Sequence, residues 1–169
     1  MTASGKTITA LQTAPGSLQP GWFYIPELGP FARPIPIPVA ISRFVAQFRA
    51  EYAGSVDWPR QLDLTAFGDI ADYVHVLARD RNSWTFERFA PSYASRIGTD
   101  LTGADIRDAR FAPYNFRLDL KLKRLLAERR PFYVPTRIDE LGGERISHRL
   151  LIPMSIDKTS ISHCLLMSV

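Results

Sequence analysis

Cysteine is nearly missing from this 169-residue chain, which contains Cys164 and no other thiol. An internal disulfide is therefore excluded, and the composition is typical of a protein of a reducing compartment. No apolar run approaches the roughly 18 residues that a membrane-spanning helix needs. The N-terminal segment MTASGKTITALQTAPG has one lysine and lacks the apolar block, about 7–15 residues long, of a secretory signal. We therefore expect a cytoplasmic location and no membrane partner.

Motifs of common enzyme classes are also missing. The sequence has no nucleophile elbow, no glycine loop that could cradle a phosphate and no paired histidine motif. Gly142 and Gly143 lie between two expected strands, so they indicate a tight hairpin turn instead of a nucleotide loop. A Ser, His and Asp triad that assembles only in space stays open as an alternative. Our main expectation is a protein without catalytic activity.

The charge pattern does not favour nucleic acid as a partner. The formal net charge is +4, and the 46% apolar and 11% aromatic content is typical of a globular protein. Basic residues gather between residues 117 and 130. The only acidic residues of this stretch are Asp119 and Glu128, and its basic residues are Arg117, Lys121, Lys123, Arg124, Arg129 and Arg130. A solvated helix face explains this surplus.

Residues 1–39 and 40–56 differ from the rest of the chain. Seven of the thirteen prolines fall between Pro15 and Pro38, which predicts an extended arm over residues 1–39. The next segment, 40–56, has helical periodicity and predicts an amphipathic helix. Its apolar stripe consists of Ile41, Phe44, Val45, Phe48 and Tyr52. Such a stripe must be buried, either on the chain's own sheet or against a twin chain, and we expect it to be the partner-binding surface of a homodimer.

Residues 57–169 predict one α+β domain. The expected helices are Leu64 to Ile70, Pro91 to Gly98, and a long helix from about Pro113 to Arg129. The expected strands are Tyr73 to Arg79, Trp84 to Phe89, Phe132 to Asp139, Arg145 to Pro153 and Ser160 to Val169. Because the links between consecutive strands are short, neighbouring strands are expected to be antiparallel.

The order of these elements resembles that of a PAS domain, in particular the small, often single-domain PAS proteins of alphaproteobacteria. The motifs that carry the resemblance are Phe86-Glu-Arg88-Phe89, Arg96-Ile97-Gly98, Asp100-Leu-Thr-Gly103, Arg129-Arg130-Pro131 and Leu150-Leu-Ile-Pro153. The resemblance covers about residues 58–169. It implies a PAS-like five-stranded antiparallel sheet with helices inserted between strands 2 and 3. It also implies a cavity between sheet and helices, which in the family holds haem, flavin, a small metabolite or only side chains.

The expected lining of such a cavity comes from both strands and helices. The candidate ligand-binding residues are Phe86, Arg88, Tyr93, Ile97, Tyr114, Leu118, His148 and His163. Arg88 is expected on the same strand face as Trp84 and Phe86, where burial is costly unless an anion meets it. The negative partner of Arg88 would be Asp100 or Asp105 if its role is structural, and a ligand carboxylate if it binds a ligand.

The cofactor stays unknown, but two kinds are disfavoured. The short helix Ser92 to Ile97 has no cysteine for the photochemical adduct of flavin-binding light sensors. Residues 104–130 contain no histidine, so the usual haem ligand on the long helix is missing. His75, His148 and His163 all fall on expected strands, where three imidazoles could gather on one face as a pH-sensitive or metal-binding cluster. Zinc sites usually show closer ligand spacing, and we expect no metal.

Three functional hypotheses follow. The first is a non-catalytic sensory or regulatory domain in signal transduction, which binds a small ligand or a signalling-protein partner. The second is a homodimeric interaction adaptor without a ligand, built on the 40–56 stripe. The third is a small cone-shaped α+β enzyme that encloses a pocket between a sheet and helices.

Overall fold

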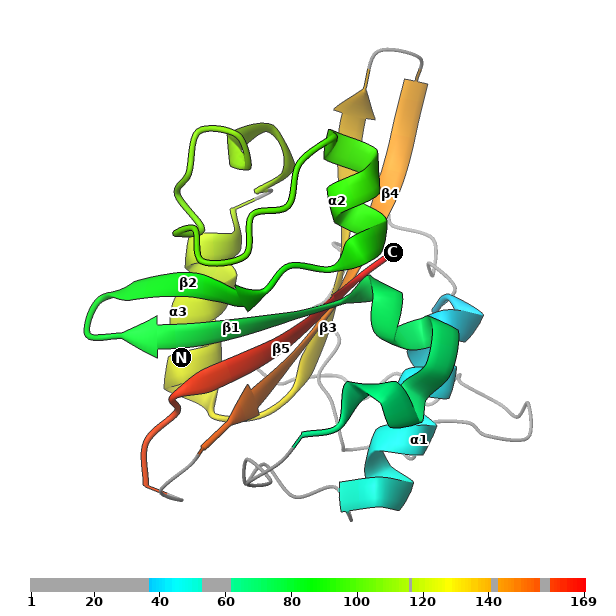
Figure 1. The fold of residues 1–169 in the computed structure, drawn as a ribbon, viewed down its shortest axis with the longest axis vertical. Helices are drawn as coiled ribbons and strands as arrows, with labels where there is room; N and C mark the ends of the chain where they lie inside the picture. Colours follow the sequence, from blue (N-terminus) through cyan, green and yellow to red (C-terminus); the bar gives the residue numbers. More distant parts are fainter. Residues whose placement is uncertain (1–36, 53–61, 116, 141–142, 156–158) are drawn as a thin grey trace, which may run out of the picture.

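The computed structural model of the chain describes residues 37–52, 62–115, 117–140, 143–155 and 159–169. Except for residues 37–39, the predicted arm lies outside the described residues. The described chain forms an α+β fold in which one antiparallel sheet has helices on both faces (Figure 1). No helix among the described residues is both long and apolar enough to cross a membrane.

The sheet has five strands, and the predicted α+β class with five antiparallel strands is confirmed. The strands are β1 (Val74–Asp80), β2 (Ser83–Arg88), β3 (Phe132–Glu140), β4 (Gly143–Met154) and β5 (His163–Ser168). Their spatial order is β2-β1-β5-β4-β3, and every neighbouring pair is antiparallel. The C-terminal strand β5 therefore lies in the middle of the sheet, between β1 and β4.

Alternation along the strands gives the sheet two buried faces, because successive side chains point to opposite sides. We call one the α3 face: its strand residues, such as Leu77, Leu151 and Leu166, share a core with α2 (Pro91–Ile97) and α3 (Leu118–Glu128). The other is the α1 face, whose residues share a core with α1 (Val39–Tyr52) and with the 3-10 turns of η1 (Leu64–Tyr73). Both faces are covered, so this is a three-layer arrangement.

Helix α1 packs on its own sheet. Ile41, Phe44, Val45 and Phe48 have no exposed surface and belong to the core of the α1 face. The Phe44 ring lies 4.9 Å from the Phe67 ring of η1, measured between centroids. The side chain of Tyr52 lies outside what the structure describes. Of the two partners expected for the stripe, the structure shows the chain's own sheet, and a dimer through these four side chains would require α1 to leave it.

The long helix is shorter than predicted. The segment expected to run from Pro113 to Arg129 is divided into the short 3-10 turn η2 (Ala112–Tyr114) and α3, which begins only at Leu118. Arg117 adopts a left-handed conformation, with φ 58° and ψ 40°, so the helix cannot continue through it. The Asn115 side chain accepts a hydrogen bond at 2.6 Å from the N–H of Leu118, the first residue of the new helix. Tyr114 consequently lies before α3, not on it.

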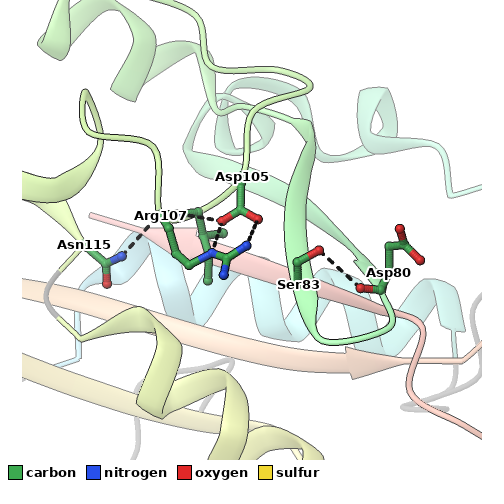
Figure 2. A network of polar contacts seen from close by, with 6 residues as sticks. Asp80, Ser83, Asp105, Arg107 and Asn115 are labelled. Carbon is green, nitrogen blue, oxygen red and sulfur yellow. Dashed lines mark hydrogen bonds and ion pairs between the residues drawn. The ribbon is translucent and has the colours of Figure 1, made fainter.

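Asn115 also holds the connection between α2 and α3 in place. Its amide nitrogen donates to the backbone carbonyl of Ile106 at 3.0 Å (Figure 2). Ile106 in turn donates its N–H to the Trp84 carbonyl of β2 at 3.0 Å. In the same connection, Asp105 accepts two side-chain hydrogen bonds from Arg107, as Figure 2 shows. The connection is thereby tied to the edge of the sheet.

We expect Asn115→Ala to lower the free energy of unfolding by about 1–2 kcal/mol, because it removes the side-chain hydrogen bonds to the Leu118 N–H and to the Ile106 carbonyl. Urea denaturation measures the change. Asn115→Asp is the matched control, since aspartate keeps the acceptor for the Leu118 N–H and loses only the bond to Ile106. The aspartate variant should retain most of the stability that the alanine variant loses. Equal stability of wild type and Asn115→Ala would contradict this role of the Asn115 side chain.

The Asp100-Leu-Thr-Gly103 motif has a structural role beside β2. Asp100 accepts hydrogen bonds from the N–H and the hydroxyl of Thr102, and the Thr102 hydroxyl accepts from the Phe89 N–H. Gly103 has a positive φ of 85° and donates its N–H to the Phe86 carbonyl. The motif therefore fastens the chain after α2 onto the end of β2.

Candidate functional site

Five of the eight predicted ligand-binding residues meet on the α3 face. Phe86, Tyr93 and Leu118 are buried together in its core, and Ile97 and Tyr114 are partly buried against it. The rings of Phe86, Phe89 and Tyr93 meet mostly edge to face, with centroids 4.8–6.3 Å apart where they are in contact. The α3 face thus brings together residues from β2, α2, η2 and α3.

Arg88 lies on the other face, which corrects the prediction that it shares a face with Trp84 and Phe86. The register between β1 and β2 shifts at Val76/Leu77, so that Phe86 pairs with Leu77 but Arg88 pairs with Val76 of the α1 face. This bulge turns Arg88 toward η1.

The partners of Arg88 also differ from the expected acids, Asp100 or Asp105. Its Nη1 donates to the Ala71 carbonyl at 2.9 Å and to the Val74 carbonyl. Partial burial lowers the pKa of Arg88, and the nearby Asp72 opposes that shift. Arg88, Asp72 and Glu87 belong to the lining of a pocket of about 690 Å³ beside η1, on the α1 side of the sheet.

The histidines are divided between the two faces, so the expected cluster of three imidazoles does not form. His75 lies on the α3 face, in contact with the Phe86 and Tyr93 rings. His148 lies on the α1 face, where its Nδ1 is 2.5 Å from the Tyr133 hydroxyl. His163, which pairs with Met154, has its Nε2 3.5 Å from a Glu87 carboxylate oxygen. Within the described ranges no three His, Cys, Asp or Glu side chains are grouped as a metal site would require.

A buried row of polar side chains on the α3 face was not predicted. We call it the polar layer: it consists of His75 on β1, Ser168 on β5, and Ser147 and Arg149 on β4, each at most 1% exposed. The strand register places Ser168 between His75 and Arg149, and Ser147 lies two residues before Arg149 on the same face. Arg149 pairs with Ser168, and His75 pairs with Leu166, two residues before Ser168 on the same face.

Arg149 is the largest fully buried side chain of the described chain. Its guanidinium donates to the backbone carbonyls of Tyr114 and Asn115, each at 2.5 Å. Burial lowers the pKa of Arg149, while a hydrogen bond with the Tyr93 side chain favours the charged form. Arg149 therefore links the middle of the sheet both to α2 and to the chain just before α3.

His75 has a defined tautomer. Its Nδ1 accepts a hydrogen bond from the Ala90 N–H at 3.1 Å, so the proton of the neutral ring is on Nε2. Burial lowers the pKa of His75 well below its usual value, and the positive charges of Arg149 and Arg88 lower it further. The ring is therefore neutral at physiological pH. Its Nε2 finds no hydrogen-bond partner among the described residues.

The two serines of the polar layer resemble His75 Nε2 in their missing hydrogen-bond partners. The hydroxyl oxygens of Ser147 and Ser168 are buried and have no hydrogen-bond partner within the described part of the chain. Cys164 is also buried, and burial raises the pKa of its thiol, so it is unsuited to act as a nucleophile. The polar layer, and not the single thiol, carries the chemically distinctive groups of the α3 face.

The sequence matches no protein-family model and no curated protein.

Proposed function

We propose that this chain is a PAS-type sensory or regulatory domain that binds a small ligand on the α3 face, beneath α2 and α3, and acts in signal transduction without catalysis. The polar layer carries the proposal. Buried polar groups in folded proteins are nearly always hydrogen-bonded, and exceptions often mark functional positions. Among the described residues, three groups without such a partner lie on one sheet face, beside a buried arginine.

The topology supports the proposal. The helices that cover the α3 face are inserted between β2 and β3, and β5 lies between β1 and β4. The resemblance to PAS domains implies the first of these features. The Phe86, Asp100 and Gly103 motifs that suggested the resemblance also have defined places at the edge of this site.

The contacts of Arg149 suggest how occupancy could change the structure. Arg149 holds the Tyr114 and Asn115 carbonyls and the Tyr93 side chain. A ligand that competes for this guanidinium would weaken its bonds to the chain before α3. Occupancy would then shift the population between two packings of sheet and helices, provided that the ligand binds the two with different affinity. Helix α1, on the opposite face of the same sheet, is the element positioned to report the change.

The two alternatives receive less support. The adaptor hypothesis needs the stripe of α1 to face a twin chain, whereas its four described side chains lie on the chain's own sheet. The enzyme hypothesis needs carboxylate and imidazole groups that converge in a cleft. His163 and Glu87 form such a pair at 3.5 Å, and Glu87 belongs to the lining of the pocket on the α1 side. On the α3 face, in contrast, His75 lies among three aromatic rings and near two arginines.

Native mass spectrometry of the freshly purified full chain tests the sensory proposal. We expect a mass larger than that of the polypeptide by one small molecule per chain, which denaturation releases for identification. The same spectrum reports the number of subunits. A bare polypeptide mass, unchanged after incubation with a small-molecule extract of the source cells, would contradict the proposal. A bare dimer would in addition favour the adaptor hypothesis.

A further inference from the structure

The pocket beside η1 has the size of a small-molecule site. Its volume is about 690 Å³, and ligand pockets of proteins typically measure about 300–1,000 Å³. Val76 and Arg88 of its lining pair with each other and belong to the α1 face. The sheet therefore separates this pocket from the polar layer, and it is a second candidate site.

A β-bulge brings two charged neighbours of β2 into the same pocket. Phe86 and Arg88 pair with consecutive residues of β1, Leu77 and Val76, so Glu87 is the extra residue of the bulge. In a regular strand, successive side chains point to opposite faces. Here Glu87 and Arg88 both line the pocket. Bulges often aim side chains in this way beside functional sites.

Arg88 is fixed at one end of its guanidinium and can bind an anion with the other. Its Nη1 donates to the carbonyls of Ala71 and Val74, whereas a guanidinium has five N–H donors. Within the described part of the chain, Nε and Nη2 of Arg88 form no further hydrogen bond. These two nitrogens present the planar fork that a carboxylate binds through two parallel hydrogen bonds.

An anion alone is a poor match for the pocket, because three carboxylates accompany Arg88 in the lining. They belong to Asp63, Asp72 and Glu87. Asp72 follows Ala71, whose carbonyl binds Arg88, and Glu87 directly precedes Arg88 in the chain. An ammonium group beside Asp72 and Glu87 would balance the excess of negative charge. A cation without a carboxylate would instead meet the guanidinium with nothing to offset it.

Much of the remaining lining is aliphatic and consists of Leu62, Leu64, Ala71 and Val76. We infer that this pocket binds an α-amino acid with an aliphatic side chain, whose carboxylate meets Arg88 and whose ammonium group meets Asp72 and Glu87. An α-amino acid carries its two charged groups on one carbon atom, which suits the adjacent places of these three side chains. The inference does not rest on the ligand proposed for the α3 face.

L-Leucine is the probe, and two analogues each lack one of its charged groups. Isopentylamine has no carboxylate, and 4-methylpentanoate has no ammonium group. The full chain is labelled with nitrogen-15 at histidine, and the ring signals are followed by NMR at constant pH during titration. His163 is the reporter, because its Nε2 lies 3.5 Å from a Glu87 carboxylate oxygen.

We expect a saturable shift of the His163 signals with L-leucine and at least ten-fold weaker binding of each analogue. The signals of His75, buried on the other face, should not move. A His163 signal that does not respond to L-leucine would overturn the inference, and so would equal binding of either analogue. A response at His75 instead would place the amino acid on the α3 face and would also overturn it.

Two variants assign the response to the pocket. Asp72→Asn should weaken leucine binding at least five-fold and leave the fold intact, because Asp72 is exposed. Asp69→Asn is the matched control: Asp69 is also exposed on η1, lies 3.9 Å from Arg43 and is outside the pocket lining. It should bind leucine like wild type. Arg88→Met should abolish binding, and if it does not fold, the aspartate variants decide. Wild-type binding by Asp72→Asn would contradict the inference.

Discussion

Replacement of Phe44 by alanine is expected to lower the free energy of unfolding by about 3–5 kcal/mol, as large-to-small changes of buried aromatic residues do. Phe44 has no exposed surface, and its ring centroid lies 5.9 Å from that of Phe48 and 4.9 Å from that of Phe67. The alanine variant would therefore leave a cavity between α1, η1 and the sheet. Urea denaturation of the full chain measures the loss.

Val39 on the same helix supplies the control. It is 73% exposed, so Val39→Ala should change the free energy of unfolding by about 0.5 kcal/mol or less. A loss of less than about 1 kcal/mol for Phe44→Ala would mean that α1 does not pack on the sheet. The helix would then be available to a partner, as the adaptor hypothesis requires.

Acidification from pH 7 to pH 5 is expected to destabilise the protein through His75. The folded-state pKa of His75 lies well below its usual value of about 6.5, because burial and the charges of Arg149 and Arg88 disfavour the imidazolium. Below pH 6.5 the unfolded chain therefore binds a proton that the folded chain does not. Stability is fully present above about pH 6.5 and is lost as the pH falls, by about 1 kcal/mol for each pH unit.

The variant His75→Gln isolates this contribution. Glutamine can still accept a hydrogen bond from the Ala90 N–H but does not titrate. The slope of stability against pH between 5 and 7 should become much smaller in this variant. His148→Gln and His163→Gln are the matched controls: burial lowers the pKa of both side chains, but both are only partly buried. An unchanged slope in His75→Gln, measured by urea denaturation at each pH, would show that His75 is not the buried neutral group described here.

The strands and most helices could be predicted because their patterns are local. The short apolar runs of β4 and β5, and the proline and glycine at the two ends of α2, place these elements nearly where the structure has them. The start of α3 could not be predicted in the same way. Arg117 adopts a left-handed conformation and the Asn115 side chain binds the Leu118 N–H, and neither feature is visible in a helical pattern that continues through both residues.

The site was harder to predict because it depends on register. One bulge between β1 and β2 moves Arg88 to the α1 face. Ser147 and Arg149 occupy alternate positions of β4, where a polar pair normally indicates a solvent-facing side. Both are instead buried, because α2, η2 and α3 cover this face. Leu151, two residues further on the same face, was the available signal that the face is buried.

The two covered faces of the sheet connect the proposed ligand site with helix α1. The polar layer lies on the α3 face, and the core residues that hold α1 lie on the alternate positions of the same strands β1, β4 and β5. A change in the packing of one face would therefore act on the other face through the same strands. We expect it to begin at Arg149, because this residue is bonded both to α2 and to the chain before α3.

A crystal structure of the full chain, purified without denaturation, is the sharpest test of a ligand site on the α3 face. We expect electron density for a bound small molecule against the polar layer, beside His75, Ser168 and Arg149. Density for a lone water there, or the side chains of these residues bonded only to one another, would contradict a ligand site on this face.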